Sequence, residues 1–203
     1  MKRAINRAAK LALAAGLAAI LAAGAAAQFA GSDAEAFLNA IRDQNGSKAT
    51  AIEAKQGGGV VNYRGYSGDT PLTVAMAKRS RTYVGFLLSK GATPDLADKR
   101  GDTPLIIAAR NGFNEGVDLM ISSRATIDLA NKQGETPLIV AVQGRHPTIV
   151  RRLLEAGANP DKTDFAAGYS ARDYARRDNR NRDLLKMIET IKRKKPAMGP
   201  TRS

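Results

Sequence analysis

A short pattern of glycine, an acidic residue, threonine, proline and leucine occurs three times in the chain. The copies begin at Gly68, Gly101 and Gly134, so they are 33 residues apart. An apolar triad keeps the same interval, at Val84, Leu87 and Leu88, at Val117, Met120 and Ile121, and at Val150, Leu153 and Leu154. Repeats of this length form stacks in which each unit buries its apolar face only against its neighbours. The sequence therefore predicts a repeat architecture.

Each repeat has the pattern of two short helices. Thr103 suits an N-cap, because its hydroxyl can accept a hydrogen bond from a free backbone N–H, and the proline after it suits the first helical position. Residues 105–109 predict a short inner helix that ends at Asn111–Gly112. The apolar triad predicts an outer helix, and Gly91 and Gly157 suit the left-handed position after such a helix. An extended β-turn connection is expected before the next threonine.

These repeats resemble the ankyrin repeat, whose opening motif is T-P-L-H-x-A. The motif stands, without its histidine, at residues 70–75, 103–108 and 136–141. Residues 145–159 are similar to the family's segment G-H-x-x-I-V-x-x-L-L-x-x-G-A-N, although Arg79, Arg124 and Arg145 stand where the family has turn glycines. The resemblance implies an all-α repeat solenoid, an ankyrin stack of about five helix-turn-helix units joined by β-hairpin-like loops.

The three full repeats are flanked by weaker copies. Residues 33–62 and 168–191 keep the phase without the full motif, as capping repeats with a wetter outer face do. We therefore expect an ankyrin-repeat domain over residues 28–191, with caps near 33–62 and 168–191. Residues 192–203 lack apolar periodicity and are expected to form a basic, disordered tail.

The N-terminal segment has the pattern of a secretory signal peptide over residues 1–27. Four basic residues precede an apolar run over residues 11–23, and small residues follow, with a cleavage position near Ala27. This pattern predicts export to the bacterial periplasm. An alternative is that the segment stays uncleaved and anchors the chain in the inner membrane, facing the periplasm.

Composition excludes several kinds of site. The chain has no cysteine and a single histidine, so thiolate metal sites, disulfides and paired-imidazole catalysis are excluded. The resemblance gives His146 a structural position at the start of an outer helix. The net charge of +13 is uneven, because residues 28–170 carry a net charge of only +2. We expect no enzyme activity, no catalytic residue, no cofactor and no metal.

The resemblance implies a protein-interaction module, which binds a partner protein through its concave face and loop tips. The partner's identity is not indicated, and the chain is expected to be monomeric. The positions that alignment places on this surface are Arg64, Tyr66, Asp69, Lys78, Lys99, Arg100, Asp102, Arg110, Asn111, Lys132, Gln133, Glu135 and Gln143.

The C-terminal charge offers an alternative function. Residues 171–203 carry a net charge of +7, which includes Lys192, Arg193, Lys194 and Lys195. Such a run is attracted to anionic lipid headgroups or polymers, so the chain could instead be an envelope-surface tether. Nucleic acid is not favoured, because no aromatic residues suited to base stacking alternate with these charges.

Overall fold

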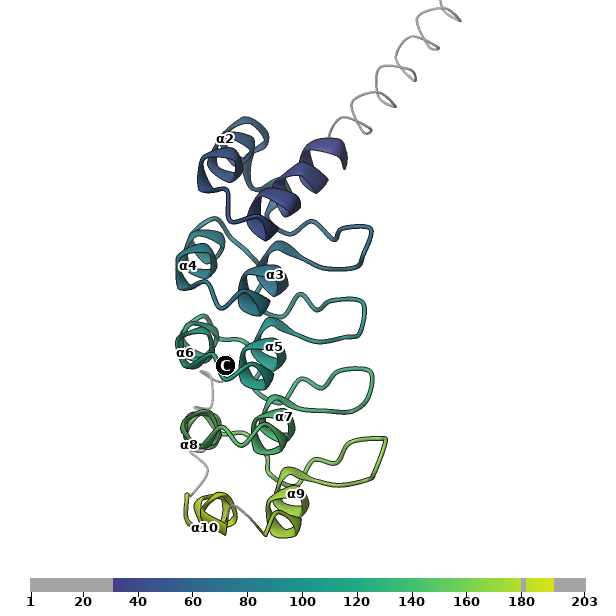
Figure 1. Ribbon diagram of the computed structural model, residues 1–203, viewed down its shortest axis with the longest axis vertical. Helices are drawn as coiled ribbons and strands as arrows, with labels where there is room; N and C mark the ends of the chain where they lie inside the picture. The colour runs from purple at the N-terminus through teal and green to yellow at the C-terminus, as the bar shows by residue number, and fades with distance from the viewer. Residues whose placement is uncertain (1–30, 180–181, 192–203) are drawn as a thin grey trace, which may run out of the picture.

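The computed structural model describes residues 31–179 and 182–191, which form five stacked helix pairs joined by loops (Figure 1). The predicted signal peptide and basic tail lie outside these residues. The helices of the five pairs are 31–42 with α2 (Gly46–Gln56), α3 (Pro71–Ala77) with α4 (Arg81–Ser89), α5 (Pro104–Arg110) with α6 (Asn114–Ser122), α7 (Pro137–Gln143) with α8 (Pro147–Glu155), and α9 (Ala171–Arg177) with α10 (Arg182–Thr190). A 3₁₀ turn, η1 (Gly57–Val60), follows α2.

The inner helices begin at the predicted threonines. The hydroxyls of Thr70, Thr103 and Thr136 each accept a hydrogen bond from the backbone N–H three residues later, and a proline follows each threonine. Ser170 caps α9 in the same way and forms a reciprocal pair with Asp173. The N-cap prediction is therefore confirmed, and it explains why α3, α5 and α7 start in the same register.

The core runs along the whole stack instead of forming one centre. In α5 the residues from Pro104 to Ala109 are all buried, and the helix packs between α3 and α7. Outer helix α6 buries Val117 and Met120 and packs between α4 and α8. Since each helix pair is covered by the pairs before and after it, stability depends on contacts between neighbouring repeats.

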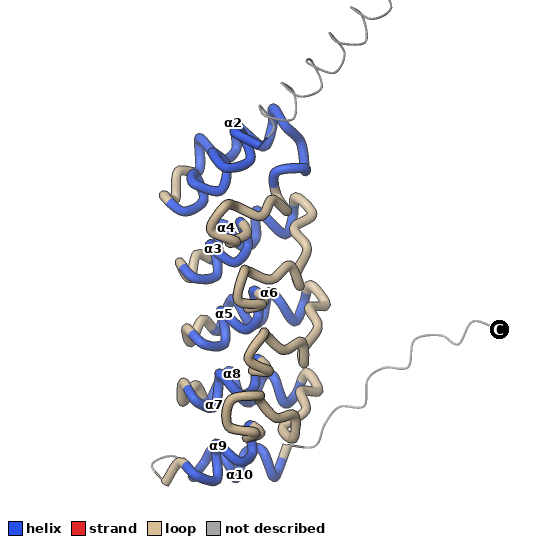
Figure 2. The backbone as a smooth tube through the Cα atoms, turned by 90° about the vertical axis from the view of Figure 1, so that its right-hand side faces the viewer, coloured by secondary structure: helices blue, strands red, loops and turns tan. Residues whose placement is uncertain are grey.

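The loops between pairs are hairpin-like turns, and the described part of the chain contains no strand (Figure 2). In the third repeat the N–H of Asp98 donates to the Asp102 carbonyl at 3.0 Å, and the N–H of Gly101 donates to Asp98 at 3.0 Å. Asn131 and Gly134 form the same pair of bonds one repeat later. An isolated antiparallel bridge joins Thr163 and Ser170. The turns are too short to extend these bonds into a ladder.

Several turns have left-handed backbone conformations. Gly91 and Gly157 have φ of 85° and 98°, which confirms the predicted ends of the outer helices. Arg79, Arg124 and Arg145, which stand where the family has turn glycines, also have positive φ, at 53°, 61° and 56°. A side chain with a Cβ is strained in this conformation. The three arginines therefore cost folding free energy at these turns.

Arg124→Gly is expected to raise the free energy of unfolding by about 1 kcal/mol, because glycine removes the left-handed strain. Arg124 is exposed and has no ion-pair partner in the described residues, so little else is lost. Urea unfolding followed by circular dichroism measures the change. Gly91→Ala is the matched control, because an added Cβ meets nothing within 4 Å and only the backbone conformation opposes it. Gly91→Ala should cost about 1 kcal/mol; a neutral result for both variants would contradict the strain argument.

Candidate protein-binding face

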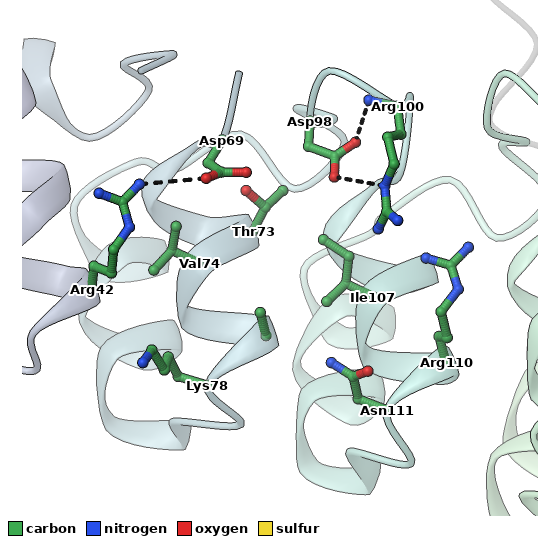
Figure 3. Close-up of a pocket in the computed structure, with 11 residues that line it drawn as sticks. Arg42, Asp69, Thr73, Val74, Lys78, Asp98, Arg100, Ile107, Arg110 and Asn111 are labelled. Carbon is green, nitrogen blue, oxygen red and sulfur yellow. Dashed lines mark hydrogen bonds and ion pairs between the residues drawn. The ribbon is translucent and has the colours of Figure 1, made fainter. Parts of the chain in front are cut away.

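The inner helices and the loop tips form one side of the stack, and the outer helices form the other (Figure 1). We call the first side the inner face, meaning the exposed ends of α3, α5, α7 and α9 with the loop tips that precede them. A groove of about 490 Å³ lies in this face between the second and third repeats. Figure 3 shows side chains of α3 and α5 beside the tip that carries Asp98 and Arg100. The predicted residues that line the groove are Asp69, Lys78, Arg100, Arg110 and Asn111.

An ionic network lies at the edge of this groove. Asp102 has a side chain only 1 % exposed, and it accepts from Arg110 at 2.6 Å and from Asn131 at 2.7 Å. Arg110 also contacts Glu135 at 3.0 Å, and Arg100 reaches Asp102 at 2.7 Å. The network links the third repeat to the fourth, because Asn131 and Glu135 belong to the next tip.

The prediction that Asp102 contacts a partner is wrong, because Asp102 is buried. Asp102 was expected at an exposed tip, but its carboxylate faces inward and is fully used within the protein. Arg110 and Glu135 are half-buried in the same network, so their charges are largely neutralised. Asn131 belongs to the network but was not predicted. A buried aspartate beside a cation from its own repeat and an amide from the next cannot serve a partner directly.

The same contacts shift the pKa values of the pair. Burial opposes ionisation of Asp102, but hydrogen bonds from Arg110 and Asn131 and the charges of Arg110 and Arg100 outweigh it and lower its pKa. Burial also disfavours the charged form of Arg110 and would lower its pKa. The Asp102 carboxylate outweighs this effect, so the pKa of Arg110 is raised. Asp102 is therefore an anion at neutral pH despite being buried.

The other predicted residues differ in their surroundings. Asp69 is half-buried, pairs with Arg42 at 3.4 Å, and accepts a hydrogen bond from Ser67. The Arg64 guanidinium donates to the Gly68 carbonyl. Tyr66 is 86 % exposed. The remaining exposed positions are Lys78, Lys99, Arg100, Asn111, Lys132, Gln133 and Gln143.

Arg42 and Phe165 are among the residues of this face that were not predicted. Arg42 ends the first inner helix and lines the groove. Phe165 is 78 % exposed and lies at the last loop tip, 33 residues after Lys132. The constant interval identifies Phe165 as the equivalent of Lys132 in the fifth repeat.

His146 has a structural contact and not a site of its own. It lies at the N-cap position of α8, and its Nε2 atom is 3.2 Å from the Arg110 carbonyl oxygen. Among the residues that the structure describes, no group of three or more His, Asp or Glu side chains is placed to hold a metal ion. In the same residues no helix has the length and apolar character needed to cross a membrane.

Three arginines of the last helix pair make contacts within the protein. Arg172 pairs with Asp161 at 2.8 Å, and Arg176 pairs with Asp173 at 3.2 Å. The Arg177 guanidinium lies over the Tyr169 ring, 4.6 Å from its centre. The residues of the predicted tether, 192–203, lie outside the described residues.

Comparison with known families agrees with this architecture. A family model of ankyrin repeats in three copies matches residues 84–164. No curated protein sequence matches the chain. The matched segment covers most of α4 and the third and fourth helix pairs, and the remaining helices continue the same stack. Residues 84–164 of this chain therefore form ankyrin repeats.

Proposed function

We propose that this protein is a periplasmic protein-interaction module that binds a partner protein through its inner face. Ankyrin repeats generally mediate protein–protein interaction and are typically not enzymes. The observation that carries the proposal is the groove between α3 and α5, which is lined mostly by polar side chains and lies next to a preformed ion-pair network. Rigid, preformed surfaces of this kind lower the entropic cost of binding.

The proposed location is supported by the first 27 residues. Their basic start, apolar run and small residues near Ala27 are the features of an export signal. Export places the inner face in the periplasm in either of the two arrangements considered, the cleaved chain or the anchored one. The mass of the N-terminal peptide from the purified envelope fraction distinguishes them.

Site-specific crosslinking in living cells tests the proposed function. A photo-crosslinking amino acid at Asn111 or at Gln143 should give discrete adducts, because both residues are exposed on the inner face. The same amino acid at Arg151 or Glu155 is the matched control, because these exposed residues lie on outer helix α8. Mass spectrometry of each adduct identifies the protein that was captured.

The outcome depends on position. Adducts with one protein from Asn111 and Gln143, and not from the α8 positions, support binding through the inner face. Equal adducts from both sides, or none from the inner face, would contradict it. Adducts to lipid alone would instead favour the envelope-surface tether.

A further inference from the structure

One register of the loop tips carries a regular series of exposed side chains. Tyr66, Lys99, Lys132 and Phe165 are 33 residues apart and occupy the tips of four consecutive repeats. We call these four residues the tip row. All four are exposed, and the two aromatic rings are 86 % and 78 % exposed. The row thus has two lysines between two aromatic ends.

The tip row is held in place by glycines of the preceding repeats. A Cβ on Gly68 would lie 2.3 Å from Cβ of Lys99, and a Cβ on Gly101 would lie 3.1 Å from Cγ of Lys132. A Cβ on Gly134 would lie 2.9 Å from the Phe165 ring. The side chains of Lys99, Lys132 and Phe165 therefore each start directly against the bare backbone of the tip before them.

Backbone hydrogen bonds fix the same tips relative to one another. The N–H of Lys132 donates to the Arg100 carbonyl at 3.2 Å, and the N–H of Phe165 donates to the Gln133 carbonyl at 2.8 Å. The spacing of the row is thus a property of the folded stack. Packed helices lie about 10 Å apart, so the row spans about 30 Å. An extended chain of about nine residues covers that length.

The charges of the row are unsatisfied within the described residues. Lys99 and Lys132 have no ion-pair partner there, and neither does Lys78 in the groove beside them. The acidic groups of the neighbouring tips are engaged, because Asp102 is buried by Arg110 and Asn131, and Glu135 contacts the same two residues. The row therefore presents positive charge at Lys99 and Lys132, while acidic groups of the same tips, such as Asp98 and Asp102, pair with other cations.

We propose that the tip row binds an extended acidic polypeptide segment, with carboxylates at Lys99 and Lys132 and apolar side chains at Tyr66 and Phe165. This deepens the proposed function and rests on it. Aromatic ends with charges between them suit a peptide, because aromatic residues anchor interfaces and charges set the register. A single-stranded nucleic acid would instead need aromatic rings at successive bases.

Fluorescence anisotropy with a defined peptide tests the proposal. The probe is a labelled peptide of ten residues with phenylalanine near each end and glutamate between, measured at low salt with the full chain. The variant Lys99→Glu with Lys132→Glu should weaken binding about tenfold, because attraction becomes repulsion at two positions. The matched control is Lys48→Glu with Arg151→Glu, which changes the net charge equally at exposed cations of α2 and α8. It should weaken binding less than about twofold.

The aromatic ends are tested separately. Phe165→Ala and Tyr66→Ala should each weaken binding several-fold, and replacing the peptide's phenylalanines with alanine should remove that difference. Equal losses in the tip-row and control variants would overturn the proposal, because binding would then follow net charge alone. Binding of anionic vesicles and of an oligonucleotide is measured with the same tip-row variant. If either ligand loses as much affinity as the peptide does, the proposal is also overturned.

The proposed function can fail independently of this inference. Inner-face crosslinks that persist in the Lys99→Glu, Lys132→Glu variant would support protein binding and overturn the acidic ligand. If the crosslinks are lost in the Lys99→Glu, Lys132→Glu variant but kept in the α2 and α8 control, the result supports both the proposed protein binding and the acidic ligand.

Discussion

Asp102→Asn is expected to lower the free energy of unfolding by about 3 kcal/mol, the cost of removing one partner from a buried ion pair. Asparagine has nearly the same shape, but it has no charge to balance Arg110 and only one oxygen for three donors. Arg110 would keep Glu135, and its side chain is one-third exposed, so the loss should lie at the lower end of the range for such pairs. Urea unfolding followed by circular dichroism measures the effect.

Asp118→Asn is the matched control. Asp118 pairs with Arg152 between outer helices α6 and α8, and its side chain is 46 % exposed. The same substitution there should cost less than about 1 kcal/mol, because water replaces the lost contact. Equal losses at Asp102 and Asp118 would show that burial of the Asp102 network adds nothing to stability.

The pH dependence of the same variant gives an independent measurement. Because the pKa of Asp102 is lowered in the folded state, its contribution to stability is complete above its unfolded pKa of about 3.9. That contribution is lost as the pH falls through the lower, folded pKa. The wild-type protein should therefore lose stability below about pH 4, and the loss should be shallower in Asp102→Asn. Parallel curves would contradict the assignment.

The inner helices could be predicted because their signals are local. A threonine followed by proline fixes where α5 begins, and the hydrogen bond from Ile106 to Thr103 needs no other part of the chain. The left-handed turns at Gly91 and Gly157 are equally local. Repetition of these signals at one interval then predicts the stack, because identical units bury matching faces.

The burial of Asp102 could not be predicted in the same way. Its position at a loop tip indicates exposure, but Asn131 from the next repeat closes over it at 2.7 Å. That contact depends on how two tips fit together, which no pattern within one repeat describes. Phe165, in contrast, could be predicted, because it lies 33 residues after Lys132 and the inserted residue of the last loop comes after it, before Gly168.

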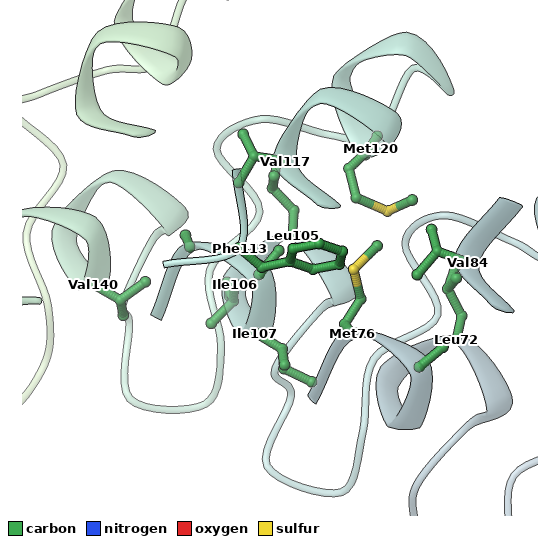
Figure 4. Packing of buried hydrophobic residues seen from close by; sticks show 14 of the residues in the cluster. Leu72, Met76, Val84, Leu105, Ile106, Ile107, Phe113, Val117, Met120 and Val140 are labelled. Atoms are coloured by element: carbon green, nitrogen blue, oxygen red, sulfur yellow. The ribbon is translucent and has the colours of Figure 1, made fainter. Parts of the chain in front are cut away.

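Phe113→Ala is expected to cost about 4 kcal/mol, within the range for removing a buried aromatic ring. Phe113 is 3 % exposed and lies between α5 and α6, where its ring points toward Met76 of the preceding repeat (Figure 4). The fit is close, because a Cβ on Gly116 would lie 2.4 Å from the ring and 3.0 Å from the Met76 sulfur. Helices on both sides hold the cavity open, so the site cannot collapse to recover the loss.

The stacked architecture adds a second expected result. Because each repeat is stabilised by its neighbours, damage at Phe113 weakens the junction between the second and third helix pairs and divides the stack there. Hydrogen exchange in Phe113→Ala should show faster exchange in α3 to α6 than in α7 and α8.

Phe165→Ala is the matched control, since the same atoms are removed from a side chain that is 78 % exposed. It should change the free energy of unfolding by less than about 0.5 kcal/mol. A similar loss in both variants, or a uniform rise in exchange along the chain, would contradict the dependence of each repeat on its neighbours.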